Sequence, residues 1–517
     1  MLRYHFRFAS NNFICRSSYQ SNQHLLNPLR FLPFFIFLFL CLSASAQSLR
    51  GTILDKDTGE AIPYATVQIG LGKGTIANEE GVFGLNLNYT ATDSLLISSM
   101  GYKQKRILAS SLTDGVIIYM VPSTIELSEV LLRNRMPTAE EIIREVRAAL
   151  PTNYAAEEQK YQMFYRATNY MNFNDLEVEI KKATAIPKSQ VAKASKQLDS
   201  LAKAIMASRL IEFQDYSGSI LLKDKDSSKI VIDRATKLID SRKDFSLDNV
   251  QEKAQNIILQ YLDTTLTYKL KTGLFKIEDS LNFDQDDFDN DKKLVFGNKE
   301  VKSSLLRTLK TSQWFEFSFL DKILNTDSYR FSLDGASYFQ DNPIYVVSFR
   351  PRRSKSKFSG KLYISSYDFA VLKADYAFSE GKEGKKFNMK LLLGVKFVEN
   401  KNEGTILYKQ NPGGTYHPYY IKRDFGNYVY LSRPLKFIEN SEEREKVIFD
   451  FTFEGEGREK KELLILSSGP LDMMEFTKLE EPKTIPYTLL EQYEASVWEN
   501  SQIIEPLEEM KNFKVSN

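Results

Sequence analysis

The sequence predicts a mainly β protein with a helical connector: an N-terminal β-sandwich, then two helices, then a large antiparallel sheet or half-barrel. Three observations predict this class. Short alternating strands separated by turns fill residues 49–120, two segments with helical period lie between 138 and 208, and Tyr- and Phe-rich strands of period two run from 216 to 466. The expected segments are a leader over 1–46, the sandwich over 47–122, the helical connector over 123–215, a β-rich domain over 216–484 and a helical tail over 485–517.

The first 46 residues have the composition of a cleaved signal peptide. They hold four Arg and no Asp, Glu or Lys, and the apolar run 31–42 is followed by Ala44-Ser45-Ala46. That run is too short to span a bilayer, and small residues at these positions are what a signal peptidase cuts. We therefore predict cleavage after Ala46 and an exported protein, periplasmic or associated with the outer membrane. An uncut signal anchor is the alternative.

The remaining composition excludes several classes of function. Without the leader, 65 Lys and Arg face 67 Asp and Glu, so the protein has no global positive field for nucleic acid. Both cysteines, Cys15 and Cys41, lie in the leader, as do two of the three histidines. His417 is left as the one imidazole, and a His-based zinc site cannot be built from a single ring. We expect no cofactor and a non-enzymatic protein.

The first segment after the leader reads as a β-sandwich. Its expected strands are 49–55, 64–70, 81–87, 94–99, 102–108 and 116–120. The alternation predicts two sets of core residues, namely Ala65, Val67 and Ile69, and Val116, Ile118 and Met120. Gly59 and Gly81 close turns in which a positive φ is expected.

Nine residues of this segment occur in a characteristic order: Gly51, Asp55, Gly59, Pro63, Ala65, Gly81, Phe83, Gly101 and Tyr102. In this order they resemble the carboxypeptidase regulatory-like (transthyretin-like) domain. The resemblance implies a seven-stranded sandwich that sits beside the working domain of metallocarboxypeptidases or ahead of outer-membrane receptors in Gram-negative cells. It implies a place in the cell envelope, but a shared fold does not establish an activity.

Two helices are expected in the connector. Thr138 and Glu141 have the spacing of a capping box, and Pro151 is expected to end that helix. The second helix, over 188–208, carries one stripe opposite its lysines, made of Val191, Ser195, Leu198, Ala202 and Ile205. Such a stripe indicates packing against a core or a partner.

The β-rich domain is expected to form one large antiparallel sheet, curved or closed. Its predicted strands are 217–224, 265–277, 343–350, 360–366, 370–378, 388–399, 405–410, 428–439 and 447–455. The residues from Ile485 onward are acidic and are expected to be helical.

Four residues form the candidate ligand site: Tyr416, His417, Tyr419 and Tyr420 follow the Gly-rich turn at 413–414. Aromatic rings beside such a turn can stack on a sugar or contact a lipid chain. The simpler interpretation is that His417 is a loop residue.

Two charged clusters are weaker candidates. Asp284, Asp286, Asp287 and Asp289 could bind calcium through oxygen ligands, but an EF-hand loop starting at Asp287 has Lys292 where Gly is required and Asn298 where Glu is required. We therefore predict a solvated loop and no metal. The basic run of Arg350, Arg352, Arg353, Lys355 and Lys357 indicates an exposed hairpin loop, with contact to an anionic lipid or glycan as the alternative.

These observations together predict a binding or adaptor module of the envelope, for a protein partner or for an apolar or glycan ligand. Peripheral association with the outer membrane fits this prediction, and a nucleic-acid partner does not. Two alternatives remain open: a glycosidase that uses two carboxylates, which needs no His or Cys, and a small outer-membrane barrel related to the receptor families.

Overall fold

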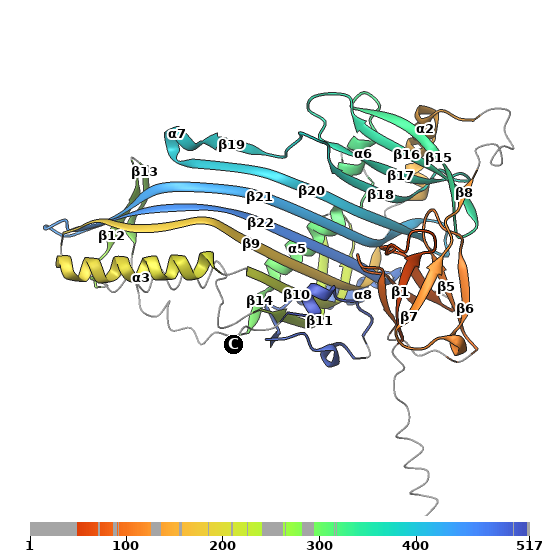
Figure 1. Ribbon diagram of the computed structural model, residues 1–517, viewed down its shortest axis with the longest axis horizontal. Coiled ribbons are helices and arrows are strands. Elements are labelled where there is room, and N and C mark those ends of the chain that lie inside the picture. Colours follow the sequence, from red (N-terminus) through yellow and green to blue (C-terminus); the bar gives the residue numbers. More distant parts are fainter. Residues whose placement is uncertain are drawn as a thin grey trace, which may run out of the picture. The chain divides into compact units, whose positions relative to one another are not determined.

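The structure of the protein is a computed structural model (Figure 1). It describes residues 49–70, 73–85, 90, 92–125, 136–154, 158–184, 186–207, 210–224, 226–239, 262–263, 265–273, 275–281, 294–314, 316, 318–499 and 501–513. The predicted signal peptide and the aspartate cluster at 284–289 lie outside these residues.

The N-terminal segment is a sandwich of two small sheets. One sheet has the order β4-β1-β7, and the other has the order β3-β2-β5-β6. The strands are β1 (Leu49–Asp55), β2 (Thr66–Ile69), β3 (Lys73–Ile76), β4 (Val82–Leu85), β5 (Ser94–Ser98), β6 (Lys105–Leu108) and β7 (Val116–Met120), and the short helix η2 (Ala109–Ser111) follows β6. All six predicted strands are present, whereas β3 was not predicted.

The sandwich core follows the predicted alternation. Ala65, Val67 and Ile69 are buried, as are Ile118 and Met120, and only Val116 remains partly exposed. A substitution of any of these residues by a polar side chain would place an unpaired polar group between the two sheets.

The residues that carry the family resemblance have backbone and packing roles. The Asp55 carboxylate accepts the backbone amides of Asp57 at 2.7 Å and Thr58 at 2.9 Å, and it also accepts the Tyr102 hydroxyl at 2.9 Å. Gly81 has φ +73°, and a Cβ there would lie 2.6 Å from the Ile53 carbonyl oxygen. These residues hold turns and strands together and need no ligand to explain them.

Among the described residues, two of the three longer helices match the predicted helical segments. α2 (Ala139–Asn153) begins with the predicted capping box, in which the Glu141 amide donates to Thr138 Oγ1 at 3.2 Å and the Thr138 amide donates to Glu141 Oε2 at 2.8 Å. α3 (Lys188–Met206) buries Leu198, Ala202 and Ile205 of the predicted stripe, whereas Val191 and Ser195 are only partly buried. α5 (Asn298–Lys310) and the short α6 (Phe319–Ile323) were not predicted.

The prediction that Pro151 ends α2 is wrong, because the helix continues to Asn153. The final turn is held from outside. The Asn153 side chain donates to the Asp368 carbonyl at 2.9 Å, and the Tyr154 hydroxyl donates to the Val371 carbonyl at 2.6 Å. These contacts offset the loss of the backbone hydrogen bond that a proline cannot donate.

The rest of the described chain forms one large, open, mostly antiparallel sheet. Its order is β24-β11-β10-β9-β22-β21-β20-β18-β17-β16-β15-β8, and β12, β13 and β19 pair at its margin. The strands are β8 (Thr124–Ile125), β9 (Gln159–Ala183), β10 (Leu210–Leu222), β11 (Ser228–Leu238), β12 (Tyr268–Thr272), β13 (Phe275–Leu281), β15 (Tyr329–Phe339), β16 (Asn342–Pro351), β17 (Phe358–Ser365), β18 (Val371–Phe378), β19 (Lys386–Met389), β20 (Val395–Gln410), β21 (Tyr416–Glu439), β22 (Lys446–Pro470) and β24 (Thr488–Leu490).

Smaller elements complete the described chain. β14 (Val295–Gly297) and β23 (Thr484–Pro486) pair as a separate two-stranded sheet. The short helices are α7 (Lys390–Leu393), α8 (Met473–Lys478), η5 (Ala495–Trp498) and α9 (Glu508–Lys511). No helix in the described ranges has the length and apolar character needed to cross a membrane.

The large sheet has two chemically different faces, and β22 shows why. Its odd-numbered residues include Leu463, Phe451 and Phe449, which pack against helices, whereas its even-numbered residues include Glu462 and Lys460. We call these the helix face and the sandwich face. α2, α5 and α6 pack on the helix face at one end of the long strands, and α3 packs on the same face along β9 (Figure 1).

The prediction of a helical connector over 123–215 is wrong for its middle, because residues 159–183 form the long strand β9. Two register shifts against β22 explain the error. The shift beside Glu454 and Gly455 moves the residues on the helix face from odd positions, such as Tyr165, to even positions, such as Val178. The shift beside Ile448 and Phe449 returns them to odd positions, such as Ala183, so the sequence shows no continuous period of two.

The predicted helical tail over 485–517 is also wrong for most of its length. Residues 488–490 are strand β24, and the buried residues 502–505 lie in neither a helix nor a strand. This segment takes its conformation from what it packs against, since Ile503 and Ile504 lie in a cluster with Phe164 of β9 and Trp498.

Candidate functional site

A row of charged and hydroxyl side chains crosses the sandwich face at one level of the sheet. Directly paired residues of neighbouring strands lie on the same face, so the strand register defines the row. In order from β17 to β11 its members are Lys361, Asp375, Thr405, Lys422, Glu462, Arg166, Asp215 and Thr236. Positive and negative charges largely alternate along it.

The buried charges in and beside this row are matched by partners. Arg166 donates from Nε and Nη2 to the two oxygens of Asp215, at 2.7 Å each. The Thr405 hydroxyl donates to Asp375 at 2.8 Å, and the Tyr420 hydroxyl donates to Glu462 at 2.8 Å. Pairing of this kind is what makes charged groups tolerable in a buried position.

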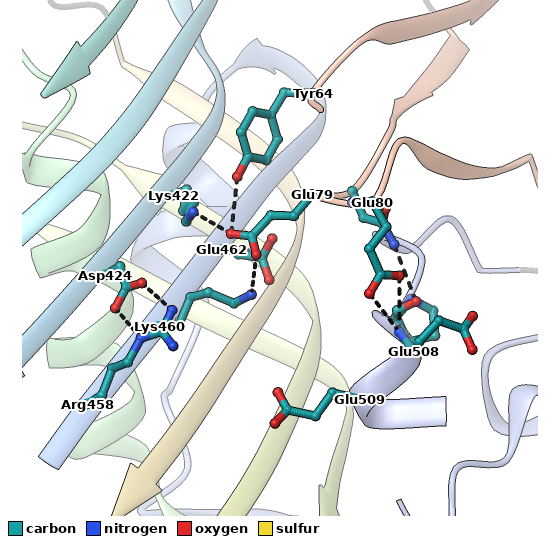
Figure 2. Close-up of polar contacts among 12 residues, drawn as sticks. Tyr64, Glu79, Glu80, Lys422, Asp424, Arg458, Lys460, Glu462, Glu508 and Glu509 are labelled. Atoms are coloured by element: carbon teal, nitrogen blue, oxygen red, sulfur yellow. Dashed lines mark hydrogen bonds and ion pairs between the residues drawn. The ribbon is translucent and has the colours of Figure 1, made fainter. Parts of the chain in front are cut away.

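Glu79 connects the sandwich to this face. Its carboxylate lies between two lysines of the sheet, with Lys460 at 3.1 Å and Lys422 on the other oxygen, and it accepts the Tyr64 hydroxyl at 3.1 Å (Figure 2). Burial disfavours the charged carboxylate, but Lys460 and Lys422 outweigh burial and lower the pKa of Glu79 to about 2. The Tyr64 ring also stacks on Tyr420, with ring centroids 5.2 Å apart.

The C-terminal segment, residues 502–506, makes a second set of contacts with the sandwich. The Asn78 side chain donates to the carbonyls of Glu505 at 3.2 Å and Pro506 at 3.3 Å, and Gln502 donates to the Gly84 carbonyl at 2.8 Å. Arg166 reaches the same segment, since its Nη1 donates to the Ile504 carbonyl at 3.1 Å. The sandwich, the sheet and the C-terminal segment therefore share one interface.

A groove crosses the sheet next to Lys422, the lysine that contacts Glu79 of the sandwich. It consists of two hollows of about 370 and 760 Å³ that share Ser359, Gly360 and Lys361. The smaller hollow is also lined by Asp375, Tyr376, Ala377, Glu403, Gly404, Thr405 and Lys422, and the larger by Glu140, Arg330, Phe331, Ser332, Ser348, Phe349 and Arg350. We call the two together the groove.

The two ends of the groove differ in charge. At one end Arg330 of β15 lies directly opposite Arg350 of β16, and both are exposed. At the other end two carboxylates are each held by a lysine of their own strand, Asp375 by Lys373 at 2.9 Å and Glu403 by Lys401 at 3.2 Å. A direct like-charge pair across two strands is unfavourable unless a negative group lies nearby, and Glu140 of α2 is the carboxylate that lines the same hollow.

The predicted ligand residues lie at the start of strand β21 and not in a loop, and the structure does not join them into one platform. Tyr416 packs with the core of the helix face, and its hydroxyl donates to Asp368 at 2.9 Å. Tyr419 and Tyr420 are buried in another cluster with Phe164. A register shift opposite Leu407 and Tyr408 puts these two neighbours on one side.

His417 is partly buried between strands. Its Nε2 lies 3.3 Å from Ser468 Oγ, and its ring stacks on Tyr161 with centroids 6.4 Å apart. Burial, with a smaller contribution from Lys409, lowers the pKa of His417 to about 4. The imidazole is therefore neutral at physiological pH.

Metal ligands do not gather within the part of the chain that the structure describes. No group of three or more His, Cys, Asp or Glu side chains there could hold an ion. The weak candidates Asp284, Asp286, Asp287 and Asp289 lie outside the described residues, so their prediction as a solvated loop stays a prediction.

The groove residues were not selected from the sequence, apart from Arg350 in the basic run. One pattern in the sequence distinguishes the two faces of the sheet. Along β22, apolar residues such as Phe449 and Leu463 occupy odd positions, and charged residues such as Glu454 and Lys460 occupy even positions. The strand register that brings Lys361, Asp375 and Lys422 together leaves no such pattern in the sequence.

Comparison with known families identifies the sandwich. The family model of the CarboxypepD_reg-like domain matches residues 49–132. These residues form a carboxypeptidase regulatory-like domain. The match confirms the resemblance carried by Gly51, Asp55, Gly59 and the other ordered residues. Of the large sheet, the match includes the edge strand β8 but not the strands from β9 onward. No curated protein matches the chain.

Solved structures show only distant likeness to the chain. A DUF1329 family protein from Desulfovibrio piger is 8% identical, with 61% of this chain and 92% of that chain covered and a TM-score of 0.18. A candidate carbohydrate binding protein from Bacteroides uniformis is 12% identical, with 37% and 98% covered and a TM-score of 0.13. A candidate membrane-associated protein of unknown function from Bacteroides fragilis is 9% identical, with 81% and 98% covered and a TM-score of 0.12. TM-scores this low support no conclusion about the CarboxypepD_reg-like domain or the sheet.

Proposed function

We propose that this chain is an exported, non-enzymatic binding protein of the cell envelope, whose groove binds an acidic glycan. The observation that carries the proposal is the exposed pair of Arg330 and Arg350 directly opposite each other in the larger hollow. Two guanidinium groups in this position can donate paired hydrogen bonds to a carboxylate or sulfate of a bound sugar.

The surroundings of this pair suit a sugar better than an apolar ligand. The hydroxyls of Ser332, Ser348 and Ser359 line the same hollow, and Lys361 continues it toward the smaller one. Hydroxyl and charged groups can exchange hydrogen bonds with the many hydroxyls of a glycan. A lipid chain would instead require a mostly apolar lining.

In our proposal the sandwich is fixed against the sheet and supports one side of the groove. Lys422 contributes to the smaller hollow and also contacts Glu79 of the sandwich. The second fastening through Asn78 and the C-terminal segment resists rotation about the first. We therefore propose that the sandwich supports the groove and does not swing as a separate adaptor.

The two carboxylates of the smaller hollow, Asp375 and Glu403, do not favour the glycosidase alternative. A glycosidase needs one carboxylic acid that is protonated before reaction and a second carboxylate across the cleft. Asp375 accepts the Thr405 hydroxyl and pairs with Lys373, and Glu403 pairs with Lys401. These contacts suit two structural anions rather than an acid and its partner.

The test is calorimetric titration of residues 47–517 with two oligosaccharides of equal length, one of galacturonic acid units and one neutral. We expect binding of the acidic oligosaccharide only, and a loss of about tenfold or more in affinity for Arg330→Ala with Arg350→Ala, since charge-assisted pairs are lost. Arg353→Ala is the matched control, because Arg353 lies in the hairpin loop and does not line the groove. Equal binding of both oligosaccharides, or binding of neither, contradicts the proposal.

The same two oligosaccharides also test the glycosidase alternative. Chromatography of the acidic and neutral oligosaccharides after long incubation would show shorter products if the protein cleaves them. Cleavage that disappears in Asp375→Asn or Glu403→Gln would establish the glycosidase instead. Export is tested by cell fractionation followed by reading of the N-terminal residue, which we expect to be Gln47.

A further inference from the structure

Three large apolar side chains are exposed together at the turn between β19 and β20. Leu391 is 101% exposed, Leu392 is 78% exposed and Phe387 is 47% exposed. We call residues 386–393, which comprise β19 and α7, the tip. Single exposed apolar residues are common on proteins, but two largely exposed neighbouring leucines beside a phenylalanine are a local apolar patch.

The fold holds the tip in this position. Gly394 directly follows α7 and has φ +64°. Its carbonyl accepts the Ser432 amide at 2.7 Å. A Cβ at Gly394 would lie 2.0 Å from the Ser432 carbonyl oxygen, so the chain can approach β21 this closely only with glycine. The Lys390 ammonium lies over the Tyr430 ring, 3.6 Å from its centroid. The leucines are thus directed outward by a turn that is anchored on both sides.

Lysines flank the apolar residues in the sequence. The segment 380–399 contains five lysines and three glutamates, so its formal charge is +2. Two of the glutamates have local partners: Glu383 lies 3.6 Å from Lys386, and Glu399 accepts the Lys385 amide at 2.8 Å. Lys390 flanks the leucines directly. A basic rim around an apolar centre matches a surface with negative headgroups above an apolar layer.

The small size of the tip argues against a protein partner. A stable protein interface buries about 800 Å² on each side, and two leucines and a phenylalanine on a short turn cannot supply that area. A bilayer has no such requirement, since each apolar side chain that enters the interface contributes separately. In Figure 1 the tip lies at the end of β20 and β21 that is remote from the sandwich, so it can enter a membrane without covering the groove.

We propose that the tip inserts Leu391, Leu392 and Phe387 into the interface of an anionic lipid bilayer. The lysines of the tip then lie at the level of the negative headgroups. This inference does not depend on the glycan proposal, because no residue of the tip lines the groove. Three apolar side chains and a modest positive charge give reversible, peripheral binding.

The first test is cosedimentation of residues 47–517 with vesicles of phosphatidylglycerol and phosphatidylethanolamine, compared with vesicles of phosphatidylcholine. We expect binding to the anionic vesicles that weakens with added salt. Leu391→Ser with Leu392→Ser should reduce the vesicle partition coefficient by about tenfold or more, since two apolar contacts are lost.

The matched control is Leu108→Ser with Ile117→Ser, which removes two exposed apolar residues of the sandwich, 55% and 54% exposed, and should leave the partition coefficient unchanged. A second variant, Lys385→Gln with Lys386→Gln, keeps the leucines and should lose the preference for anionic vesicles. A single Leu391→Trp reporter should shift its fluorescence to shorter wavelength when anionic vesicles are added.

Any of three results would overturn the inference, two of them in vesicle binding and one in oligomeric state. One is wild-type protein that fails to bind anionic vesicles, and another is a serine variant that binds them as well as the wild type does. The third is a wild-type dimer, seen by light scattering, that becomes monomeric in the serine variant, because a second copy of the chain would then cover the tip.

Discussion

Arg166 of β9 and Asp215 of β10 lie directly opposite each other and form a two-pronged ion pair, with their side chains 4% and 0% exposed. The same guanidinium also donates to the Ile504 carbonyl of the C-terminal segment at 3.1 Å. One buried charge thus links two neighbouring strands to the segment that fastens the sandwich. Because the pair lies out of contact with water, the two charges depend on each other.

Removal of one partner of this pair should be strongly destabilising. For Arg166→Met we expect a loss of about 3–5 kcal/mol in the free energy of unfolding, since Asp215 would be left as an uncompensated buried charge. The double variant Arg166→Met with Asp215→Leu should recover a large part of that loss. Urea denaturation followed by circular dichroism measures both, and equal stability of the single and double variants would contradict the expectation.

Glu79 should make the docking of the sandwich sensitive to acid. Lys460 and Lys422 outweigh burial and hold its pKa at about 2, against an ordinary value of 4.5. A carboxyl with a lowered pKa in the folded state stabilises above its unfolded pKa, so this contribution is complete above about pH 4.5 and is lost as the pH falls toward 2.

For Glu79→Gln we therefore expect a loss of roughly 2–3 kcal/mol at pH 7, and a shallower fall in stability between about pH 4.5 and 2. Chemical denaturation at several pH values gives both quantities. Exposed Glu60 of the sandwich offers the control: Glu60→Gln should leave the curve of the wild type unchanged. A Glu79→Gln curve parallel to the wild-type curve would show that the lysine pair does not hold this carboxylate.

His417 should remain neutral through the physiological range. Burial and Lys409 lower its pKa to about 4, whereas an unfolded histidine titrates near 6.5. A histidine with a lowered folded pKa costs stability as the pH falls below 6.5, because the unfolded chain takes up the proton first. Residues 47–517 contain one histidine, so its ring resonances in NMR are assigned without ambiguity. They should not shift between about pH 8 and 5.5, and a midpoint near 6.5 would disprove burial of the ring.

Gly404 should tolerate no side chain. It lies beside the groove on β20, and a Cβ there would meet the Tyr376 hydroxyl at 2.5 Å and the Lys422 carbonyl oxygen at 2.6 Å. Overpacking of this kind costs about 1–3 kcal/mol, so Gly404→Ala should lower the melting temperature by several degrees. Gly469→Ala on β22 is the control, since no atom lies within 4 Å of its would-be Cβ. Equal melting temperatures of the two variants would contradict the close packing at Gly404.

The sandwich was predictable because its residues act locally. Gly81 serves a tight turn, Asp55 accepts amides two and three residues away, and alternating residues such as Val67 form the core. The capping box of α2 is similarly local, since Thr138 and Glu141 are three residues apart. Such features depend on short spacings, which the order of residues shows directly.

The errors occurred where distant contacts decide the conformation. β9 was missed because bulges against β22 shift its alternation, and residues 502–505 are not helical because they pack against Phe164 and the sandwich. The candidate ligand residues were chosen for their closeness in sequence, but the register shift at Tyr408 sends Tyr416 and Tyr420 into different clusters. No local pattern encodes a register between strands that are hundreds of residues apart.

The sequence alone determined that the chain is mainly β and begins, after its first 46 residues, with a carboxypeptidase regulatory-like domain, because turn glycines, caps and alternation act over a few residues. Only the tertiary structure decided that Glu79 meets Lys422 and Lys460, that Arg330 faces Arg350, and that Leu391 is left without cover. Strand register and long-range packing fix these relationships, and both arise from the folded chain as a whole.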